Sequence, residues 1–359
     1  MRLSFAARLR TVPPVGTDTI PPRKPSQIWA LVRNWGGFVK FSHTLFALPF
    51  AFAAMALASR AKFSELPEAE REAFAALERG WPGWRTFLLI LAAMVTARTC
   101  AMAFNRIADR DYDAANPRTR ERHLPAGKIS LTSAWTLTLL SAAAFLVACW
   151  FLPRICFYLA PVALFFIFFY SLTKRFNDFT HIFLGIALAI APVGAWLAVT
   201  GEIQFIASDS GSFMGKIRHG LFTPLTMSVL VLAWVVGFDL IYSIQDYEFD
   251  RENKLHSLVV RWGPDNAIQA ALLCHMLMYG ILVFFGLLSG FKLEYWIGLV
   301  VIMGCLGLEH WIVRRRLRKG EFRLAEQQFF RLNALISMIF LVVVLAEVAL
   351  IDFWSFRGM

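Results

Sequence analysis

The sequence predicts an all-α, polytopic membrane protein with nine transmembrane helices around a central cavity. Three observations predict this class. Of the 359 residues, 58% are hydrophobic and 17% are charged, whereas a soluble domain carries about 25% charged residues. The apolar residues fall in runs of about 20, the length that a helix needs to cross a bilayer. Short loops rich in Lys and Arg separate these runs, which is typical of membrane proteins.

The nine spans follow from the apolar runs, which are too long and too weakly alternating for the strands of a transmembrane barrel. The third and fourth runs meet at Leu152-Pro153-Arg154, which predicts a tight hairpin. We expect the spans near residues 38–58, 84–108, 131–152, 154–173, 178–200, 223–247, 266–289, 293–312 and 328–352.

The chain begins with a basic stretch that is not expected to cross the membrane. Residues 1–25 contain five basic residues and one acid, with no apolar core long enough for a signal peptide. They predict a disordered cytoplasmic tail, although an Arg-rich start also resembles a transit peptide and leaves an organelle open. Residues 26–37 suit an interfacial helix anchored by Trp29 and Trp35. Residues 26–359 are then expected to form a single transmembrane domain.

Loop charge predicts the orientation of the chain. More Lys and Arg residues follow the even-numbered spans than the odd-numbered ones, and the loop after span one carries five glutamates. Because basic loops stay on the cytoplasmic side, we expect a cytoplasmic N-terminus and a multi-pass protein of the bacterial inner (cytoplasmic) membrane. The net charge of +11 lies mainly in these loops, so nucleic acid is not an expected partner.

The first functional pattern is an acidic stripe at the end of span two. Asn105, Asp109 and Asp113 recur every four residues, so on a helix their side chains lie on one face. Two carboxylates and an amide oxygen suit a hard divalent cation, Mg²⁺ above all. The alternative is a solvated helix cap.

A second acidic stripe lies about 130 residues later. Asp239, Tyr242, Asp246 and Asp250 share one helical face by their spacing. Both stripes end spans that face the same compartment, which predicts a metal-bridged anion held between them. Asp239 lies inside span six, where a carboxylate is costly unless it is functional or paired with Arg98 or a tyrosine. Tyr242 is either a substrate contact or a packing residue.

Basic side chains surround both stripes. Arg98 lies seven residues before the first stripe, on the same helix face, and an arginine at that depth is costly unless it binds an anion. Arg118 and Arg122 follow the stripe, and Lys174 and Arg175 follow span four on the same side of the membrane. Such cations suit phosphate oxygens, so the two stripes together predict a metal–diphosphate site.

Other polar residues predict no chemistry. His181, His275 and His310 are isolated in the sequence and are expected to satisfy local helix contacts. The five cysteines fall in apolar segments without a CxxC spacing, so we expect buried free thiols.

Three patterns together resemble the UbiA superfamily of membrane prenyltransferases. Residues 105–113 match N-x-x-x-D-x-x-x-D, and residues 246–250 match D-x-x-x-D. Residues 118–127 match the arginine-rich R-T-x-x-R-x-L-P-x-G, and the resemblance covers roughly residues 30–352. Arg106 stands where many members have an aspartate. We expect this change to leave the chemistry intact, because no expected metal ligand is lost.

Residues 40–50 are similar to a bacterial branch labelled 4-hydroxybenzoate polyprenyltransferase. This resemblance implies Mg²⁺-dependent transfer of a polyprenyl group from polyprenyl diphosphate to the ring of a hydroxyaryl acid, in ubiquinone biosynthesis. Some members of the branch instead use a naphthoate acceptor in the futalosine route to menaquinone, which is the alternative. Prenylation of haem or chlorophyll is a further alternative within the superfamily.

The resemblance also implies residue roles. Four aspartates would hold two Mg²⁺ ions that bridge the diphosphate, with Asn105 orienting it and nearby cations taking the remaining phosphate charge. Asp239 or a diphosphate oxygen would accept the proton that the ring loses, and Phe-rich helices would house the isoprenoid tail. The implied metal ligands are Asp109, Asp113, Asp246 and Asp250, and the implied phosphate partners are Arg98, Lys174, Arg175, Arg118 and Arg122.

The rival function of another class is an ion-coupled transporter, because paired acids within membrane helices also mark cation pathways. Transporters typically have broken helices near the midplane and repeat symmetry. The acids here lie near one face beside arginine-rich loops, which favours the diphosphate enzyme.

Overall fold

The computed structural model describes residues 34–39, 47–205, 213–318 and 322–349, and every regular element among them is a helix. The predicted tail of residues 1–25 and most of the predicted interfacial helix lie outside these ranges. Residues 34–38 are helical, and the ring of Trp35 packs edge-on against Phe38 with centroids 5.7 Å apart.

Eight helices in the described ranges are long and apolar enough to cross a membrane. They follow predicted spans two to nine, with ends that differ by a few residues. The Leu152-Pro153-Arg154 hairpin also forms, because α8 begins directly after Pro153. The helices are α5 (Trp84–Ala108), α7 (Leu131–Trp150), α8 (Arg154–Phe169), α9 (Thr180–Thr200), α11 (Phe222–Ser243), α14 (Pro264–Ser289), α15 (Leu293–Leu317) and α16 (Phe322–Ala349).

The first predicted span corresponds to α2 (Leu48–Ser64), a helix of 17 residues. Part of that span, residues 40–46, lies outside the described ranges, so the ninth crossing is not established. At its other end α2 runs past the predicted end at 58. The added turn carries Lys62, whose Nζ donates to Val199 O at the end of α9, 2.9 Å away.

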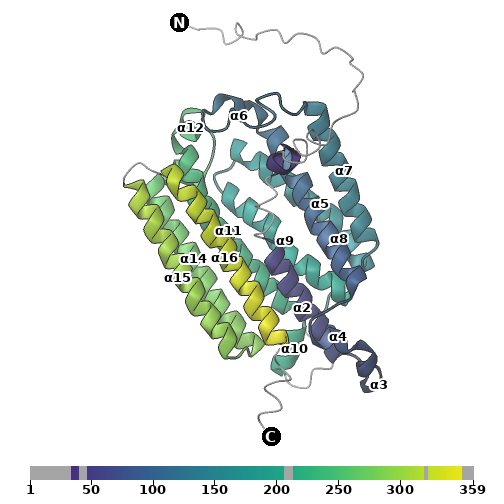
Figure 1. The fold of residues 1–359 in the computed structure, drawn as a ribbon. Helices are drawn as coiled ribbons and strands as arrows, with labels where there is room; N and C mark the ends of the chain where they lie inside the picture. The colour runs from purple at the N-terminus through teal and green to yellow at the C-terminus, as the bar shows by residue number, and fades with distance from the viewer. Residues whose placement is uncertain (1–33, 40–46, 206–212, 319–321, 350–359) are drawn as a thin grey trace, which may run out of the picture.

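Short helices connect the long ones. Figure 1 shows that α6 and α12 lie together at one end of the bundle, with α3, α4 and α10 at the opposite end. The short elements are α3 (Glu68–Arg71), η2 (Glu72–Phe74), α4 (Ala75–Glu78), α6 (Arg110–Ala115), η3 (Tyr170–Arg175), α10 (Phe213–His219), η4 (Ile244–Asp246), α12 (Tyr247–Glu252) and α13 (Leu258–Trp262).

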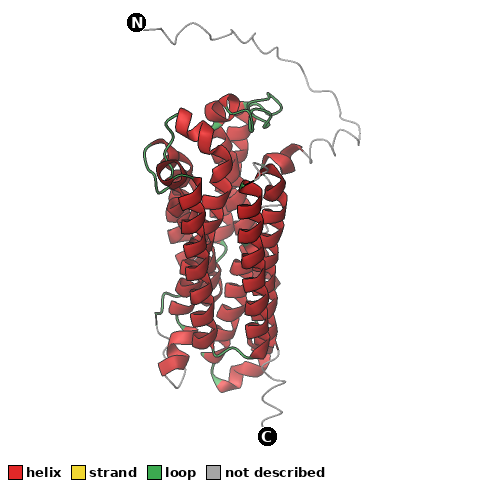
Figure 2. Cartoon of the chain, turned by 90° about the vertical axis from the view of Figure 1, so that its left-hand side faces the viewer, coloured by secondary structure: helices red, strands yellow, loops and turns green. Residues whose placement is uncertain are grey.

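The long helices run side by side along the molecule (Figure 2). Helix α9 packs against α2 and α11, and α11 packs against α14. Large side chains fill the space between them: the rings of Phe50 and Phe340 stack with centroids 4.9 Å apart, and Trp234 is buried beside Phe50. Outward-facing apolar side chains such as Leu273 and Val300 are exposed in the protein, which suits contact with lipid.

A buried polar cluster lies between α11, α14, α15 and α16. The indole Nε1 of Trp234 donates to Asn333 Oδ1 (2.8 Å), and Asn333 Nδ2 donates to Glu309 Oε2 (3.0 Å). His275 Nδ1 and His310 Nε2 are 2.9 Å apart. The prediction that these two histidines satisfy only local helix contacts is therefore wrong, because this contact joins α14 and α15.

Each acidic stripe crosses a helix break, which corrects the prediction of two continuous helix faces. Helix α5 ends at Ala108, and α6 begins at Arg110. The three side chains of the first stripe still share one face across the break. The helical hydrogen bonds continue there: Asp109 N–H donates to Asn105 O, and Asp113 N–H donates to Asp109 O.

In the second stripe, α11 ends at Ser243, and a 3₁₀ turn at Ile244–Asp246 precedes α12. A 3₁₀ turn winds the chain more tightly than an α-helix. It turns Asp246 toward Asn116 and Arg118, which donate to its carboxylate. The partners are about 130 residues apart in sequence, so the spacing of residues near Asp246 does not predict these contacts.

Candidate active site

One cavity of about 430 Å³ reaches the end of the bundle where α6 and α12 lie, because residues of both short helices line it. Helices α5, α8, α9 and α11 form its walls, with acids and bases at one end and apolar residues deeper in. The structure brings all twelve predicted site residues to this one cavity. They are Arg98, Asn105, Asp109, Asp113, Arg118, Arg122, Lys174, Arg175, Asp239, Tyr242, Asp246 and Asp250.

The aspartates of the first stripe each have a basic neighbour. Arg122 donates to Asp113 Oδ1 at 2.6 Å. Asp109 accepts a hydrogen bond from Asn105 (3.1 Å), and Arg175 lies 3.7 Å from its other oxygen. Burial raises the pKa of Asp109 to about 6, with Lys174 and Arg175 opposing that rise.

Arg106 also belongs to this group, although the sequence reasoning gave it no role. Its side chain is buried and its guanidinium lies 3.9 Å from Asp113 Oδ2. The residue that replaces an aspartate of the family pattern therefore adds a cation beside a predicted metal ligand. The departure from the pattern thus replaces a negative charge by a positive one at the site.

The second stripe is tied to the loop that follows the first. Arg118 donates through Nε and Nη2 to both oxygens of Asp246, at 2.9 and 2.5 Å. Asn116 donates to the same carboxylate at 3.0 Å. Bidentate pairing fixes the orientation of both groups, so this pair joins the two acidic stripes across 128 residues of sequence.

Lys174 lies among the acidic groups. Its ammonium is 3.5 Å from Asp250 Oδ2 and also interacts electrostatically with Asp246, Asp109 and Asp239. The turn that carries it is held by the backbone, because His256 N–H donates to Lys174 O at 2.8 Å. The loop between α12 and α13 thereby fixes η3 over the cavity.

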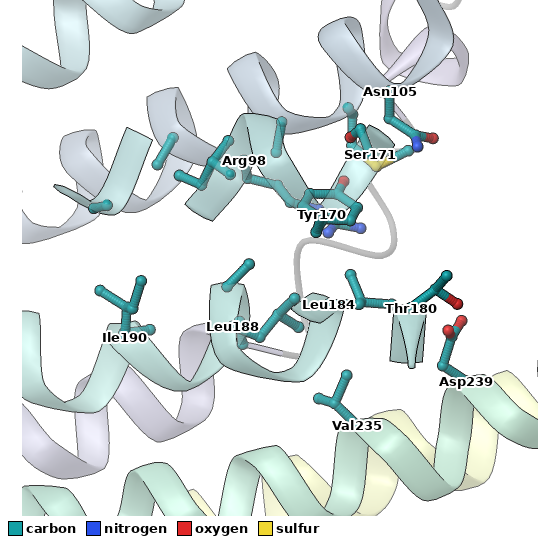
Figure 3. A pocket seen from close by; sticks show the side chains of 18 of the residues that line it. Arg98, Asn105, Tyr170, Ser171, Thr180, Leu184, Leu188, Ile190, Val235 and Asp239 are labelled. Carbon is teal, nitrogen blue, oxygen red and sulfur yellow. The ribbon is translucent and has the colours of Figure 1, made fainter. Parts of the chain in front are cut away.

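The deeper wall of the cavity carries a second polar group (Figure 3). Arg98 lies beside Tyr170 on one side, and Thr180 and Asp239 lie across the cavity from them. Arg98 makes no ion pair with the aspartates among the described residues, and its Nε is buried there without a hydrogen-bond partner. The structure thus separates Arg98 from the cations that pair with the two acidic stripes.

Asp239 has a partner that the sequence reasoning did not name. His181 Nδ1 lies 2.6 Å from Asp239 Oδ2, and the His181 side chain is fully buried. The expected alternatives were a pair with Arg98 or a tyrosine, and the prediction that His181 satisfies a local helix contact is wrong, because its partner lies on α11. Thr180, Tyr170 and Asn116 were also missed; only their closeness to the charged residues in sequence pointed to them.

The acidic groups fit Mg²⁺ held partly by a substrate. Asp113 Oδ2 is buried and accepts no hydrogen bond from the described part of the chain, and its nearest cation is the Arg106 guanidinium at 3.9 Å, so this oxygen can bind a metal ion without breaking a hydrogen bond. No three His, Cys, Asp or Glu side chains converge on a ready metal site in the same part. Mg²⁺ typically takes one or two carboxylates and completes its shell with phosphate oxygens and water, so pairs of aspartates suffice.

The inner part of the cavity is apolar, with Leu184, Leu188, Ile190 and Val235 facing its centre (Figure 3). Alanine and leucine contribute most of this lining, and few phenylalanines do. Several phenylalanines, such as Phe165, are instead exposed on the outside of the bundle. The shape suits an apolar chain with a charged head at the acidic end.

Known proteins share both the sequence and the fold. A model of the UbiA prenyltransferase family matches residues 47–335. A 4-hydroxybenzoate octaprenyltransferase of Paraburkholderia phytofirmans is 29% identical over 249 residues, which cover 68% of this chain and 78% of that protein. A protein of the same name from Cupriavidus necator is 29% identical over 242 residues, covering 67% and 78%.

Solved structures agree. The apo structure of a UbiA homolog from Aeropyrum pernix K1 has a TM-score of 0.67 at 28% identity and covers 85% of this chain and 98% of that one. A UbiA homolog from Archaeoglobus fulgidus bound to GPP and Mg²⁺ has a TM-score of 0.55 at 17% identity, covering 86% and 99%, and this likeness concerns the fold alone. Since the family model spans most of the sequence, the chain belongs to the UbiA prenyltransferase family and is a multi-pass membrane prenyltransferase.

Proposed function

We propose that this protein transfers a polyprenyl group from a polyprenyl diphosphate to the ring of a hydroxyaryl acid of the 4-hydroxybenzoate type, with Mg²⁺, in ubiquinone biosynthesis. The observation that carries the proposal is the division of one cavity. Four aspartates and their basic partners lie at its mouth, whereas Arg98 and Asp239 lie deeper, beside apolar walls. The names of the curated relatives support this acceptor class.

The mouth of the cavity is the proposed donor site. Asp109, Asp113, Asp246 and Asp250 line the same cavity, and these four would hold the metal. Bound Mg²⁺ would neutralise diphosphate charge and make it a better leaving group. Arg118, Arg122, Lys174 and Arg175 would exchange their aspartate partners for phosphate oxygens, with Asn105 orienting the diphosphate, because guanidinium and ammonium groups bind both anions well.

The deeper polar group is the proposed acceptor site. Within the described residues Arg98 makes no ion pair with the aspartates, so we assign it to the carboxylate of the acceptor instead of to the diphosphate. Asp239, across the cavity, would face the hydroxyl of the same ring. Tyr242 lies between the two sites on α11 and stacks on Arg118, which favours a role in positioning that guanidinium.

The proposed reaction breaks one bond and forms one. The allylic C–O bond of the donor breaks, and its electron pair leaves with the diphosphate. The ring carbon ortho to the hydroxyl then bonds to the allylic carbon, and the ring loses one proton to a base. The apolar walls exclude water that would otherwise capture the allylic cation.

The alternative acceptor is a dihydroxynaphthoate of the futalosine route to menaquinone. We also propose that α2 is the ninth span, that the N-terminus is cytoplasmic, and that residues 26–359 form one domain in the inner membrane. Each of the membrane acids in the cavity has a partner, which supports an enzyme site more than the ion pathway of a transporter.

The test is prenyl transfer by membranes that contain the overproduced protein. Radiolabelled geranyl diphosphate is supplied with Mg²⁺ and either 4-hydroxybenzoate or a dihydroxynaphthoate, and lipid-extractable aromatic product is counted. Membranes with the Asp109→Ala variant are the control. Label in the benzoate product supports the proposal. Label in the naphthoate product alone supports the dihydroxynaphthoate acceptor instead. No labelled product with either acid contradicts the proposal.

A further inference from the structure

His181 lies behind Asp239, outside the cavity itself. Asp239 on α11 lines the cavity, with 15% of its side chain exposed, whereas the His181 side chain on α9 is 0% exposed and is not part of the lining. The two meet through a single contact, Nδ1 to Oδ2 at 2.6 Å. The carboxylate is thus reached from the cavity on one side and held by the imidazole on the other.

The surroundings fix the proton on His181. A carboxylate only accepts, so Nδ1 carries the proton and donates it to Asp239. His181 Nε2 is buried and has no hydrogen-bond partner in the part of the chain that the structure describes. A nitrogen without a proton tolerates that position better than an N–H donor, which also favours the tautomer with its proton on Nδ1.

The contact also selects how Asp239 points. His181 occupies Oδ2, and Oδ1 accepts no hydrogen bond from the described residues, so it is available to the cavity. Without the imidazole the carboxylate is free to turn toward Lys174, with which it already interacts electrostatically. A proton acceptor must lie within hydrogen-bond reach of the proton it removes, and a locked rotamer provides that.

We propose that His181 is a positioning residue for prenyl transfer, holding Asp239 so that Oδ1 accepts the hydroxyl proton of the acceptor. This inference rests on the proposed function. As the ring carbon attacks, the hydroxyl proton passes to Oδ1 and the hydroxyl oxygen becomes a carbonyl. The ring proton then leaves to a diphosphate oxygen, and Asp239 returns its proton to the carbonyl oxygen, which restores the aromatic hydroxyl.

The test compares transfer with hydrolysis of the donor. Purified wild-type protein, His181→Leu, His181→Asn, Asp239→Asn and the double variant His181→Leu/Asp239→Asn receive geranyl diphosphate, Mg²⁺ and 4-hydroxybenzoate. Prenylated product and released diphosphate are both measured. The Asn side chain offers an N–H near the position of Nδ1, so it can replace the hydrogen bond that Leu removes.

We expect His181→Leu to lower kcat for transfer about 100-fold, the scale of a lost proton acceptor. KM for geranyl diphosphate and the rate of donor hydrolysis should stay within a few-fold of wild type, because the donor site is untouched. His181→Asn should recover most of the transfer. The double variant should be no worse than Asp239→Asn alone, since coupled residues are not additive.

Several results would overturn the inference. Transfer by His181→Leu close to the wild-type rate excludes a positioning role. Equal losses in the Leu and Asn variants, losses that multiply in the double variant, or donor hydrolysis that falls with transfer all indicate a structural role only. A wild-type protein that hydrolyses geranyl diphosphate but alkylates no hydroxyaryl acid refutes the proposed function, and this inference with it.

Discussion

The pair of Arg118 and Asp246 makes one substitution especially informative. Asp246→Asn keeps the shape of the side chain and removes its charge, at a position where the carboxylate is only 12% exposed. The change weakens the bidentate contact with Arg118 and removes one of the four carboxylates proposed to hold Mg²⁺. Asp111→Asn is the matched control, because Asp111 carries the same charge nearby but is 84% exposed, and its ion-pair partner is the surface residue Arg110.

The size of the effect follows from electrostatics. The lost interaction is that between the Asp246 carboxylate and a cation beside it. Two unit charges 4 Å apart interact by about 4 kcal/mol at an effective dielectric constant of about 20, which suits a partly exposed site. Since about 1.4 kcal/mol corresponds to a tenfold change in rate, we expect Asp246→Asn to lower prenyl transfer by 100- to 1,000-fold. Asp111→Asn should stay within about twofold of wild type, because exposed ion pairs contribute little.

The assay is incorporation of radiolabelled geranyl diphosphate into lipid-extractable product, with equal amounts of protein in the membrane checked by immunoblot. Asp246→Asn with more than a tenth of the wild-type rate would refute the metal role of this carboxylate. Equal losses in both variants would show that the overall charge of this end of the bundle matters, and not the geometry of the site.

Three further predictions follow from the same structure. Chelation of divalent cations should abolish transfer and added Mg²⁺ should restore it; full activity after dialysis against excess EDTA would contradict the Mg²⁺ site. Gly237→Ala places a Cβ 2.5 Å from His275 Cδ2, whereas Gly304 has open space around it. We therefore expect Gly237→Ala to destabilise the protein by about 1–3 kcal/mol, seen as a lower Tm in detergent, with Gly304→Ala unchanged; equal Tm values would refute the close packing of α11 on α14. Asn333→Leu removes hydrogen bonds to Trp234 and Glu309 and should cost about 2–4 kcal/mol, whereas Asn253→Leu, on the surface, should leave Tm within a degree or two.

The sequence was sufficient for the long helices because each needs only a run of apolar residues, and α5 begins and ends at the predicted residues. The acidic motifs were also predictable, since four-residue spacing survives the break at Asp109. The pair of His181 and Asp239 was not, because the two residues are 58 positions apart and a single histidine carries no spacing signal. Arg106 was missed for another reason: it precedes Asp113 by seven residues, the spacing of one helix face, but that spacing alone does not single out an ion pair.

The aspartates at the cavity mouth have a consequence for how the protein is made. Since Arg122, Arg118, Lys174 and Arg175 each lie against one of these carboxylates, the chain brings its own counter-charges to an anionic cluster at the membrane surface. Inserting and storing the apoprotein then requires no divalent ion, and magnesium starvation should silence turnover without unfolding the bundle. When Mg²⁺ and the diphosphate bind, Mg²⁺ replaces the basic side chains as the partner of the aspartates. The diphosphate makes this exchange favourable because its oxygens take up the displaced basic side chains.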